Sequence, residues 1–480
     1  QNPNWITPGK TYLKMYVVQD AMYRVDKSDF TNAGIDVSSI DPRTVKIYNK
    51  GNQVPVYFSG ESDGTFDKGD FLDFYGERNY GGNTKFYDEI GSYQYTLYEY
   101  YGIYSDTNIY WVDWGGAQGL RYEDFTYSTG TDYSSSNFNE MLHFEKDSVF
   151  SLGQQINVND YRRFSVDNFM GEDWYWRYLT PYYDVTQSVN TPKLDASAST
   201  FNLRVTGYPA ARSTSLFNEH NVQIIINGTV ITTVVANDFN RMDTTVTLPV
   251  SLLSSSANNQ IKLFYFPSGA LNLQFYLDYF EITYPRIFTL DGSALKMNLP
   301  LGDSTSKRFT INSVNTSAPV NIYDIRNNLR ITNNAFNAGN LQFTAKSNSK
   351  LEIINADITQ KPFRIKQKSV PNLVSNLTGA DYIIVYNRMF ESQAEAIRSY
   401  RQSNDGMRSF KAEIEDLYDV YNYGLENPSA VRLFLKTAYE NWTAPKMKYV
   451  CLFGRGSLDP KNNQARTPGN FYGNVVPVYG

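Results

Sequence analysis

The side chains best suited to nucleophilic chemistry are scarce in this chain of 480 residues, which has one cysteine, Cys451, and two histidines, His143 and His220. A cysteine nucleophile needs a base, usually histidine, to take up its proton. Cys451 lies within an apolar run, between Val450 and Leu452, and no histidine follows it. Because free cysteines are among the most buried residues, we predict that Cys451 is inaccessible. We also predict that both histidines make structural hydrogen bonds and that this chain contains no catalytic residue.

Three aspartates, Asp63, Asp67 and Asp70, surround two glycines and offer several oxygen ligands on a short loop. Such oxygens suit Ca²⁺, although the spacing is not that of an EF-hand loop. Aspartates also accept hydrogen bonds from backbone N–H groups in turns. We favour the turn and keep a structural Ca²⁺ site as the alternative. No other cofactor is expected.

A cluster of aromatic residues, Trp174-Tyr175-Trp176, offers rings that can stack on sugars. In a β-sandwich, such residues more often fill the core or an edge. We favour the core, and a surface carbohydrate-binding protein stays open as an alternative function.

Composition excludes several classes of protein. The formal net charge is −5 and basic residues are scattered among acidic ones, so nucleic acid is not an expected partner. A single cysteine excludes an intramolecular disulfide and a thiolate zinc cluster. No apolar run reaches the length of about 18 residues that a spanning helix needs, so the chain is not expected to span a membrane. Gln1 in place of an initiator methionine favours an exported chain that has lost its leader, with trimming as the alternative.

Most of the chain has the composition of strands and tight turns. Aromatic residues make up 15% of it, together with many Thr, Asn, Ser and Gly residues. We predict a mainly β protein with an N-terminal β module at residues 1–135, a β-sandwich at 136–285 and a small β module at 286–375. In the sandwich, Asn227-Gly228 between two strand-like runs predicts a hairpin, because both residues accept the positive φ angles of a two-residue turn.

The pattern changes at about residue 376. Continuous apolar runs at residues 382–386 and 449–453 are typical of parallel strands that are buried on both faces, and residues 409–414 resemble a third strand. Helical spacing at residues 393–402 and 428–442 predicts helices between these strands. Residues 376–480 are therefore predicted to begin an α/β domain with a parallel sheet.

Four segments, in this order, are similar to segments of a known family. They are Glu61-Ser62-Asp63-Gly64-Thr65-Phe66-Asp67-Lys68-Gly69-Asp70 leading to Phe74-Tyr75-Gly76, then Leu277-Asp278-Tyr279-Phe280-Glu281-Ile282, then Ala380-Asp381-Tyr382-Ile383-Ile384-Val385, and last Leu452-Phe453-Gly454-Arg455-Gly456-Ser457-Leu458-Asp459-Pro460. Each segment alone is a weak signal, but their order and spacing cover nearly the whole chain. The chain resembles the type IX secretion sortases, a family whose peptidase domain is gingipain-like.

The resemblance implies a caspase-like or gingipain-like α/β fold, with the catalytic His and Cys on loops beyond Gly480, so that this chain alone is expected to be inactive. It places five residues at the rim of the substrate cleft: Gly454, Arg455, Gly456, Ser457 and Asp459. A simple turn is an equal alternative for this segment. The sequence departs from the family at Arg455, where the resemblance leads us to expect aspartate. At a strand end that builds a site, this exchange reverses the local electric field.

The resemblance also implies a function in type IX secretion: the protein would process or attach cargo that carries a C-terminal sorting domain, at the cell surface and peripheral to the outer membrane. Its implied partners are that cargo and a PorV-like outer-membrane β-barrel. Arg455 keeps a second function open, namely a non-catalytic docking paralogue that binds the barrel or the cargo. A surface carbohydrate-binding β protein ranks last because it does not explain the α/β segment.

Overall fold

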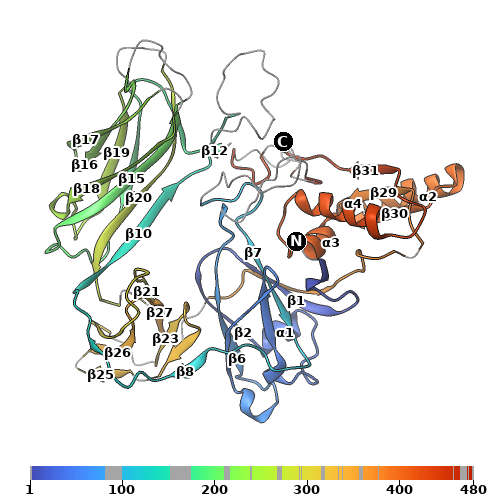
Figure 1. Cartoon of the computed structure of the whole chain (residues 1–480), viewed down its shortest axis with the longest axis horizontal. Coiled ribbons are helices and arrows are strands. Elements are labelled where there is room, and N and C mark those ends of the chain that lie inside the picture. Colours follow the sequence, from blue (N-terminus) through green and yellow to red (C-terminus); the bar gives the residue numbers. More distant parts are fainter. Residues whose placement is uncertain are drawn as a thin grey trace. The chain divides into compact units, whose positions relative to one another are not determined.

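The structure is a computed structural model that divides into two compact units, residues 1–122 with 359–480 and residues 123–358 (Figure 1). It describes residues 3–81, 100–151, 174–209, 217–237, 240–266, 273–290, 292, 294–314, 319–332, 334–337, 339–355, 360–376, 378–457, 459–464, 473 and 475–477.

The first unit begins with two antiparallel sheets that pack face to face. One sheet has the order β28 (Arg364–Ser369), β1 (Thr11–Val17), β7 (Asn108–Asp113), β3 (Lys46–Asn49) and β4 (Asn52–Val54). The other has the order β2 (Ala21–Asp26), β6 (Phe71–Gly76) and β5 (Val56–Ser59). Alternate side chains of both sheets, among them Leu13, Val17, Val25 and Phe74, form one core. Because β28 comes from the distant residues 364–369, this module is closed by chain that follows the second unit.

Helix α1 (Lys27–Asn32) follows β2 and is capped by Asp26, whose side chain accepts hydrogen bonds from the backbone N–H groups of Ser28 and Asp29. The carboxylate of Asp29 in turn accepts from the backbone N–H of Asp26, which completes a capping box. The short 3-10 turns among the described residues are η1 (Pro3–Trp5), η2 (Pro42–Thr44), η3 (Glu61–Asp63), η7 (Val250–Leu252) and η8 (Arg388–Phe390).

The first unit ends with a parallel sheet of the order β30 (Ser409–Glu413), β29 (Tyr382–Tyr386) and β31 (Tyr449–Phe453). Ile383 and Val385 of β29 face a core that includes α3 (Ile414–Tyr421) and α4 (Ser429–Asn441). Ile384 and Tyr386 face the opposite side, where α2 (Glu391–Asp405) packs. The predicted parallel strands and the helix between them are thereby confirmed, because an apolar run without alternation needs cover on both faces.

The α/β segment shares its core with the first β module. Trp111 on β7 and Tyr12 on β1 belong to the same buried cluster as Leu417 and Tyr421 of α3. The indole N–H of Trp5 donates to the carbonyl of Val420 at 3.0 Å, and the N-terminus accordingly lies beside α3 in Figure 1. These two parts of the first unit therefore form one packed body.

The second unit contains the predicted β-sandwich. One sheet has the order β10 (Asn137–Glu145), β20 (Phe275–Ile287), β15 (Thr200–Pro209) and β18 (Met242–Pro249), and β13 (Arg177–Leu179) also pairs with β20. The other has the order β14 (Asp184–Val189), β19 (Asn259–Tyr265), β16 (His220–Ile226) and β17 (Thr229–Ala236). Asn227 and Gly228 have φ angles of 50° and 83°, as the predicted hairpin turn requires. A small ribbon pairs β11 (Val149–Phe150) with β12 (Trp174–Tyr175).

Two further sheets of the second unit enclose a core that includes Phe309, Ile322, Phe343 and Ile353. One has the order β21 (Ala294–Asn298), β27 (Lys350–Asn355), β23 (Val320–Asp324), β24 (Leu329–Ile331) and β8 (Glu123–Phe125). The other has the order β25 (Ala335–Asn337), β26 (Asn340–Lys346), β22 (Ser306–Ile311) and β9 (Thr131–Asp132).

The prediction of a mainly β protein that ends in the beginning of an α/β sheet is confirmed. Among the described residues before Leu373, the only α-helix is α1, which has 6 residues. The three boundaries that divide the chain into four domains, at residues 135, 285 and 375, stay a prediction.

Candidate functional site

Parallel α/β sheets build their sites at the carboxyl ends of their strands. In this chain Asn387 and Arg388 follow β29, Glu413 ends β30, Ile414 begins α3, and Gly454 follows β31. Because β29 runs parallel to both of its neighbours, these residues lie along one edge of the sheet. A site is therefore expected at this edge.

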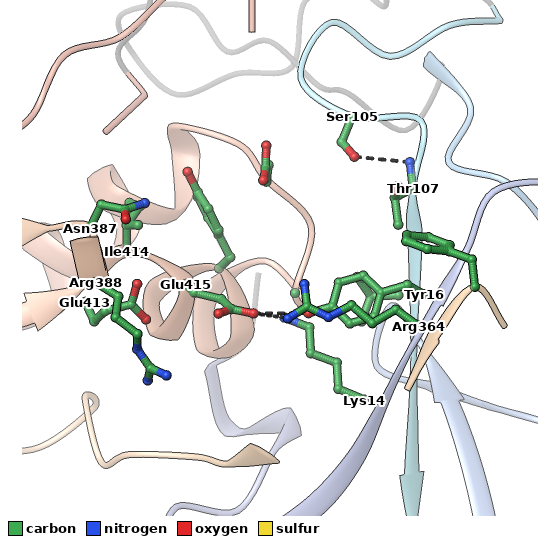
Figure 2. Close-up of a pocket in the computed structure, with 15 residues that line it drawn as sticks. Lys14, Tyr16, Ser105, Thr107, Arg364, Asn387, Arg388, Glu413, Ile414 and Glu415 are labelled. Carbon is green, nitrogen blue, oxygen red and sulfur yellow. Dashed lines mark hydrogen bonds and ion pairs between the residues drawn. The ribbon is translucent and has the colours of Figure 1, made fainter. Parts of the chain in front are cut away.

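A cavity of about 390 Å³ is present at this edge, within the first compact unit. Figure 2 shows Asn387, Arg388 and Glu413 of the α/β segment on one side of it. On the other side the first β module contributes Tyr16 and Arg364. The cavity is thus built jointly by the α/β segment and the β module.

Buried charges hold these two walls together. Lys14 of β1 is 1% exposed, and its Nζ lies 2.5 Å from Asp419 Oδ1 and 3.2 Å from Glu415 Oε1, both on α3. Burial by itself lowers the pKa of Lys14, but the charge of Asp419 and the neighbouring Tyr16 and Glu415 raise it above its ordinary value. Lys14 is therefore a permanent cation that anchors α3 on β1.

Glu415 makes several of these contacts. It pairs with Lys366 of β28 as well as with Lys14, and the hydroxyl of Tyr16 donates to its Oε1 at 3.1 Å. Burial alone would raise the pKa of Glu415, but Lys14 and Lys366 hold it well below its usual range. Burial raises the pKa of Tyr16 to about 12, so its hydroxyl stays a donor at neutral pH.

Lys368 of β28 adds a second anchor for α3. Its Nζ lies 2.6 Å from Asp416 Oδ1 and 3.3 Å from Asp419 Oδ2. Burial raises the pKa of Asp416 in spite of this lysine. Three lysines of the β module thus meet three acids of α3, which fixes the position of α3 and of the cavity wall that it forms.

Glu413 differs from these acids because none of the salt bridges between described residues includes it, although the charge of Lys368 and the backbone N–H of Glu415 act on it. It is 7% exposed, it lines the cavity, and its Oε2 has no hydrogen-bond partner among the described residues. Burial raises the pKa of Glu413 above its ordinary value. A buried carboxyl oxygen without a partner is costly. Glu413 was not among the site residues predicted from the sequence, although an acid at the end of a predicted parallel strand was a signal for it.

The five residues predicted at the cleft rim follow β31, and none of them lines the cavity. The carbonyl of Arg455 accepts from the backbone N–H groups of Val475 and Val476 at 3.0 and 3.2 Å. The hydroxyl of Ser457 accepts from the backbone N–H of Asp459 at 3.0 Å. Gly454, exposed, and Gly456, half-buried, flank Arg455, and Leu458 of the same motif lies outside the described residues. Their place at a substrate cleft stays a prediction.

Asp459 has a clear structural task. It is 3% exposed, and its carboxylate accepts hydrogen bonds from the backbone N–H groups of Asn463 at 2.7 Å and Gln464 at 3.1 Å. Asp459 therefore closes the turn that follows β31, in agreement with the turn alternative.

This turn is attached to the first β module by charges that the sequence did not indicate. Lys461 Nζ lies 3.4 Å from Asp106 Oδ2, and Arg78 lies 2.9 Å from the same carboxylate. The ring of Tyr101 lies 5.1 Å below the Lys461 ammonium.

The three aspartates of the possible Ca²⁺ site behave as turn residues. Asp63 accepts from the backbone N–H of Thr65 at 2.9 Å, and Asp70 accepts from that of Asp67 at 2.7 Å. Within the described residues no group of three or more His, Cys, Asp or Glu side chains is arranged to hold a metal ion. The geometry favours the turn.

Cys451 is half-buried, so the prediction that it is inaccessible is wrong. The reason is that, among the described residues, no strand pairs with β31 on the side away from β29, and Val450 and Leu452 are also exposed there. Burial, together with the neighbouring thiol of Cys451, raises the pKa of Tyr382 on β29.

Both histidines make hydrogen bonds inside the sandwich of the second unit. His143 Nε2 lies 2.7 Å from Glu145 Oε2, and its Nδ1 lies 3.0 Å from Glu281 Oε1. His220 is fully buried, with its Nδ1 2.7 Å from the hydroxyl of Tyr265. Both have the structural role that the sequence predicted.

The aromatic cluster of the second unit is buried. Trp174, Tyr175 and Trp176 are 2%, 2% and 6% exposed, and Trp176 stacks on Phe280 at a centroid distance of 5.7 Å. The cluster therefore fills the interior and does not form an open platform for sugars.

Comparison with known proteins agrees with this geometry. Residues 375–480 match the model of peptidase family C25. The crystal structure of dimeric latent PorU from Porphyromonas gingivalis superposes on 94% of this chain, with a TM-score of 0.62 and 17% sequence identity. The chain has a PorU-like fold. It spans 42% of the length of that PorU chain, and the predicted resemblance is confirmed at the level of fold and of the C25 match.

A further similarity of this chain to a solved structure is too weak to carry an argument. The match is to the carbohydrate-binding module CBM36 in complex with calcium and xylotriose. It includes 22% of this chain and 77% of that module, with 18% sequence identity and a TM-score of 0.17. No curated protein matches the chain. Among the described residues, no helix combines the length and apolar character needed to cross a membrane.

Proposed function

We propose that this chain is the front portion of a cysteine peptidase of the type IX secretion system, which removes the C-terminal sorting domain from exported cargo. The observation that carries the proposal is the match of residues 375–480 to peptidase family C25 within a chain of PorU-like fold. The packed core shared by the β module and the α/β segment supports it, since the β module then positions the start of the peptidase domain.

In the proposed reaction, a thiolate outside this chain attacks the scissile carbonyl and forms a thioester. The sorting domain leaves as an amine that takes its proton from a histidine. A hydroxyl or amine of a surface lipopolysaccharide, or water, then attacks the thioester and restores the thiol. Cys451 is not this nucleophile, because it lies within a strand and neither histidine of this chain is on the same compact unit.

A non-catalytic docking paralogue is the second candidate, and Arg455 is the observation that favours it. This exposed residue follows β31 at the carboxyl edge of the sheet, where the resemblance leads us to expect an acid. In either case the proposed location is the cell surface, with a PorV-like barrel and cargo as partners.

Deletion of the gene in its own bacterium tests the proposal. Mass spectrometry of cell-surface cargo should show that the sorting domain is retained in the deletion strain and removed again after complementation. Normal processing of cargo in the deletion strain would contradict the peptidase. If cargo is processed normally but lost from the surface, the docking paralogue is supported.

A further inference from the structure

The sheet β14-β19-β16-β17 of the second unit has one face on the sandwich core and one face outside (Figure 1). Leu263 on β19 and Ile224 on β16 belong to the core. Because successive side chains of a strand point to opposite faces, their neighbours Phe264 and Gln223 point outward. Phe264 and Gln223 are paired across the two strands, so they lie side by side on the outer face.

Three aromatic rings gather at one end of this outer face. The ring centres of Phe264 and Phe266 are 6.3 Å apart, with planes only 26° from parallel. The ring of Tyr182 lies 5.7 Å from that of Phe266, because the backbone N–H of Tyr182 donates to the carbonyl of Tyr265. Tyr182 and Phe266 are 59% and 49% exposed. The three rings, Tyr182, Phe264 and Phe266, therefore form an exposed aromatic platform, and exposed apolar groups that cluster in this way mark binding surfaces.

Hydrogen-bonding side chains stand beside these rings. Phe264 lies between Asp184 on β14 and Gln223 on β16, and Gln223 is paired in turn with the exposed Thr233 on β17. The Nζ of Lys262 lies 2.8 Å from Asp184 Oδ2 and 5.7 Å from the ring centre of Phe264. Carboxylate, ammonium, amide and hydroxyl groups thus surround the aromatic platform.

The charges of this sheet favour an uncharged ligand. Asp184 and Lys262 are the only acidic and basic residues of its four strands, and they neutralise each other. The centre of a protein–protein interface is depleted of charged residues, so an ion pair beside the central ring fits a protein partner poorly. A sugar fits better, because its C–H face stacks on an aromatic ring while its hydroxyls donate and accept hydrogen bonds at the edge.

We propose that the aromatic platform binds an uncharged polysaccharide chain, whose sugar rings stack on Tyr182, Phe264 and Phe266. The hydroxyls of those sugars form hydrogen bonds with Asp184 and Gln223. This site is separate from the buried aromatic cluster at residues 174–176. The proposal rests on this sheet alone and does not depend on the proposed peptidase function.

Affinity electrophoresis of the 480-residue chain tests the proposal. Native gels are prepared with mannan, laminarin or hydroxyethyl cellulose, which are neutral polysaccharides, and with dextran sulfate, which is a polyanion. At least one neutral polysaccharide should retard the chain relative to a gel without polymer. Unchanged migration in all three neutral gels, or retardation by dextran sulfate alone, would overturn the proposal.

Matched variants assign the binding to the platform. Phe266→Ala and Tyr182→Ala each remove one exposed stacking ring, so each should leave the melting temperature unchanged and weaken binding of the retarding polysaccharide about tenfold. The control is Phe336→Ala, which removes a ring that is also 49% exposed, on β25 of the same unit, and which should bind like the unchanged chain. If Phe266→Ala and Tyr182→Ala bind as tightly as Phe336→Ala, the polysaccharide binds elsewhere and the proposal is wrong.

Discussion

At the residue scale, His143 shows how this protein accommodates a buried ionisable group. Its ring lies between the carboxylates of Glu145 and Glu281, at 2.7 and 3.0 Å, inside the sandwich of the second unit. Burial by itself lowers the pKa of His143, but the hydrogen bonds and charges of both glutamates raise it above its ordinary value. The pKa of Glu281 is lowered, because His143 outweighs the effect of burial.

These shifts predict how the stability of the second unit depends on pH. A histidine whose pKa is raised on folding stabilises the fold below its unfolded value of about 6.5, and this contribution is lost as the pH rises through the higher folded value. His143→Gln should therefore lower the melting temperature more at pH 6 than at pH 9. Thermal unfolding of both proteins at these two pH values checks it, and an equal loss at both would show that His143 is neutral in the folded protein.

At the scale of elements, α3 is held on the first β module by charges that are far apart in the chain. Lys14 and Asp419 are 405 positions apart and both are buried. Removing one member of a buried pair leaves the other uncompensated, at a cost of about 3–5 kcal/mol. The same network forms one wall of the cavity.

Lys14→Met should accordingly destabilise the contact between α3 and β1 by about 3 kcal/mol, at the lower end of this range, because Lys368 stays 3.3 Å from Asp419. Hydrogen exchange of the α3 amides measures this locally. The control is Lys436→Met on the exposed face of α4, whose nearest acid is 3.9 Å away, and which should change stability by less than about 0.5 kcal/mol. Equal exchange in the two variants would contradict the anchoring role.

The exposure of β31 in the described part of this chain gives a second prediction at this scale. Cys451 is half-buried, so a thiol reagent should modify it in the native chain, more slowly than in the unfolded chain. Complete protection, or labelling at the unfolded rate, would each disagree with the structure. Kinetics of labelling with and without denaturant distinguish the three cases.

The same elements show what the sequence could and could not predict. The strands at 382–386 and 449–453 and the hairpin at Asn227-Gly228 were predictable, because they depend on local periodicity and local φ preferences. The burial of Cys451 was mispredicted because the position of β31, the last strand of the sheet among the described residues, is not a local property of the sequence. Lys14 and Asp419 had no local signal as a pair, since they meet only after segments 405 positions apart have packed together.

At the scale of the whole molecule, the two compact units differ in their content: the first joins a β module to the start of the C25-like segment, and the second consists of β-sandwich sheets. The proposed function places this chain at the outer membrane, where a protein partner retains it. Fractionation of cells with and without the PorV-like barrel checks this. The protein should be released from the membrane fraction when the barrel is deleted, and continued retention would require another anchor.

The central claim, that this chain belongs to a cysteine peptidase whose nucleophile lies outside these 480 residues, is tested most directly by cleavage of purified cargo. The account predicts that the 480-residue chain cleaves nothing. It also predicts that the complete protein carrying Cys451→Ala removes the sorting domain normally, and that a thiol-alkylating reagent abolishes this activity. Cleavage by the 480-residue chain, or loss of activity in the complete protein through Cys451→Ala alone, would contradict the account.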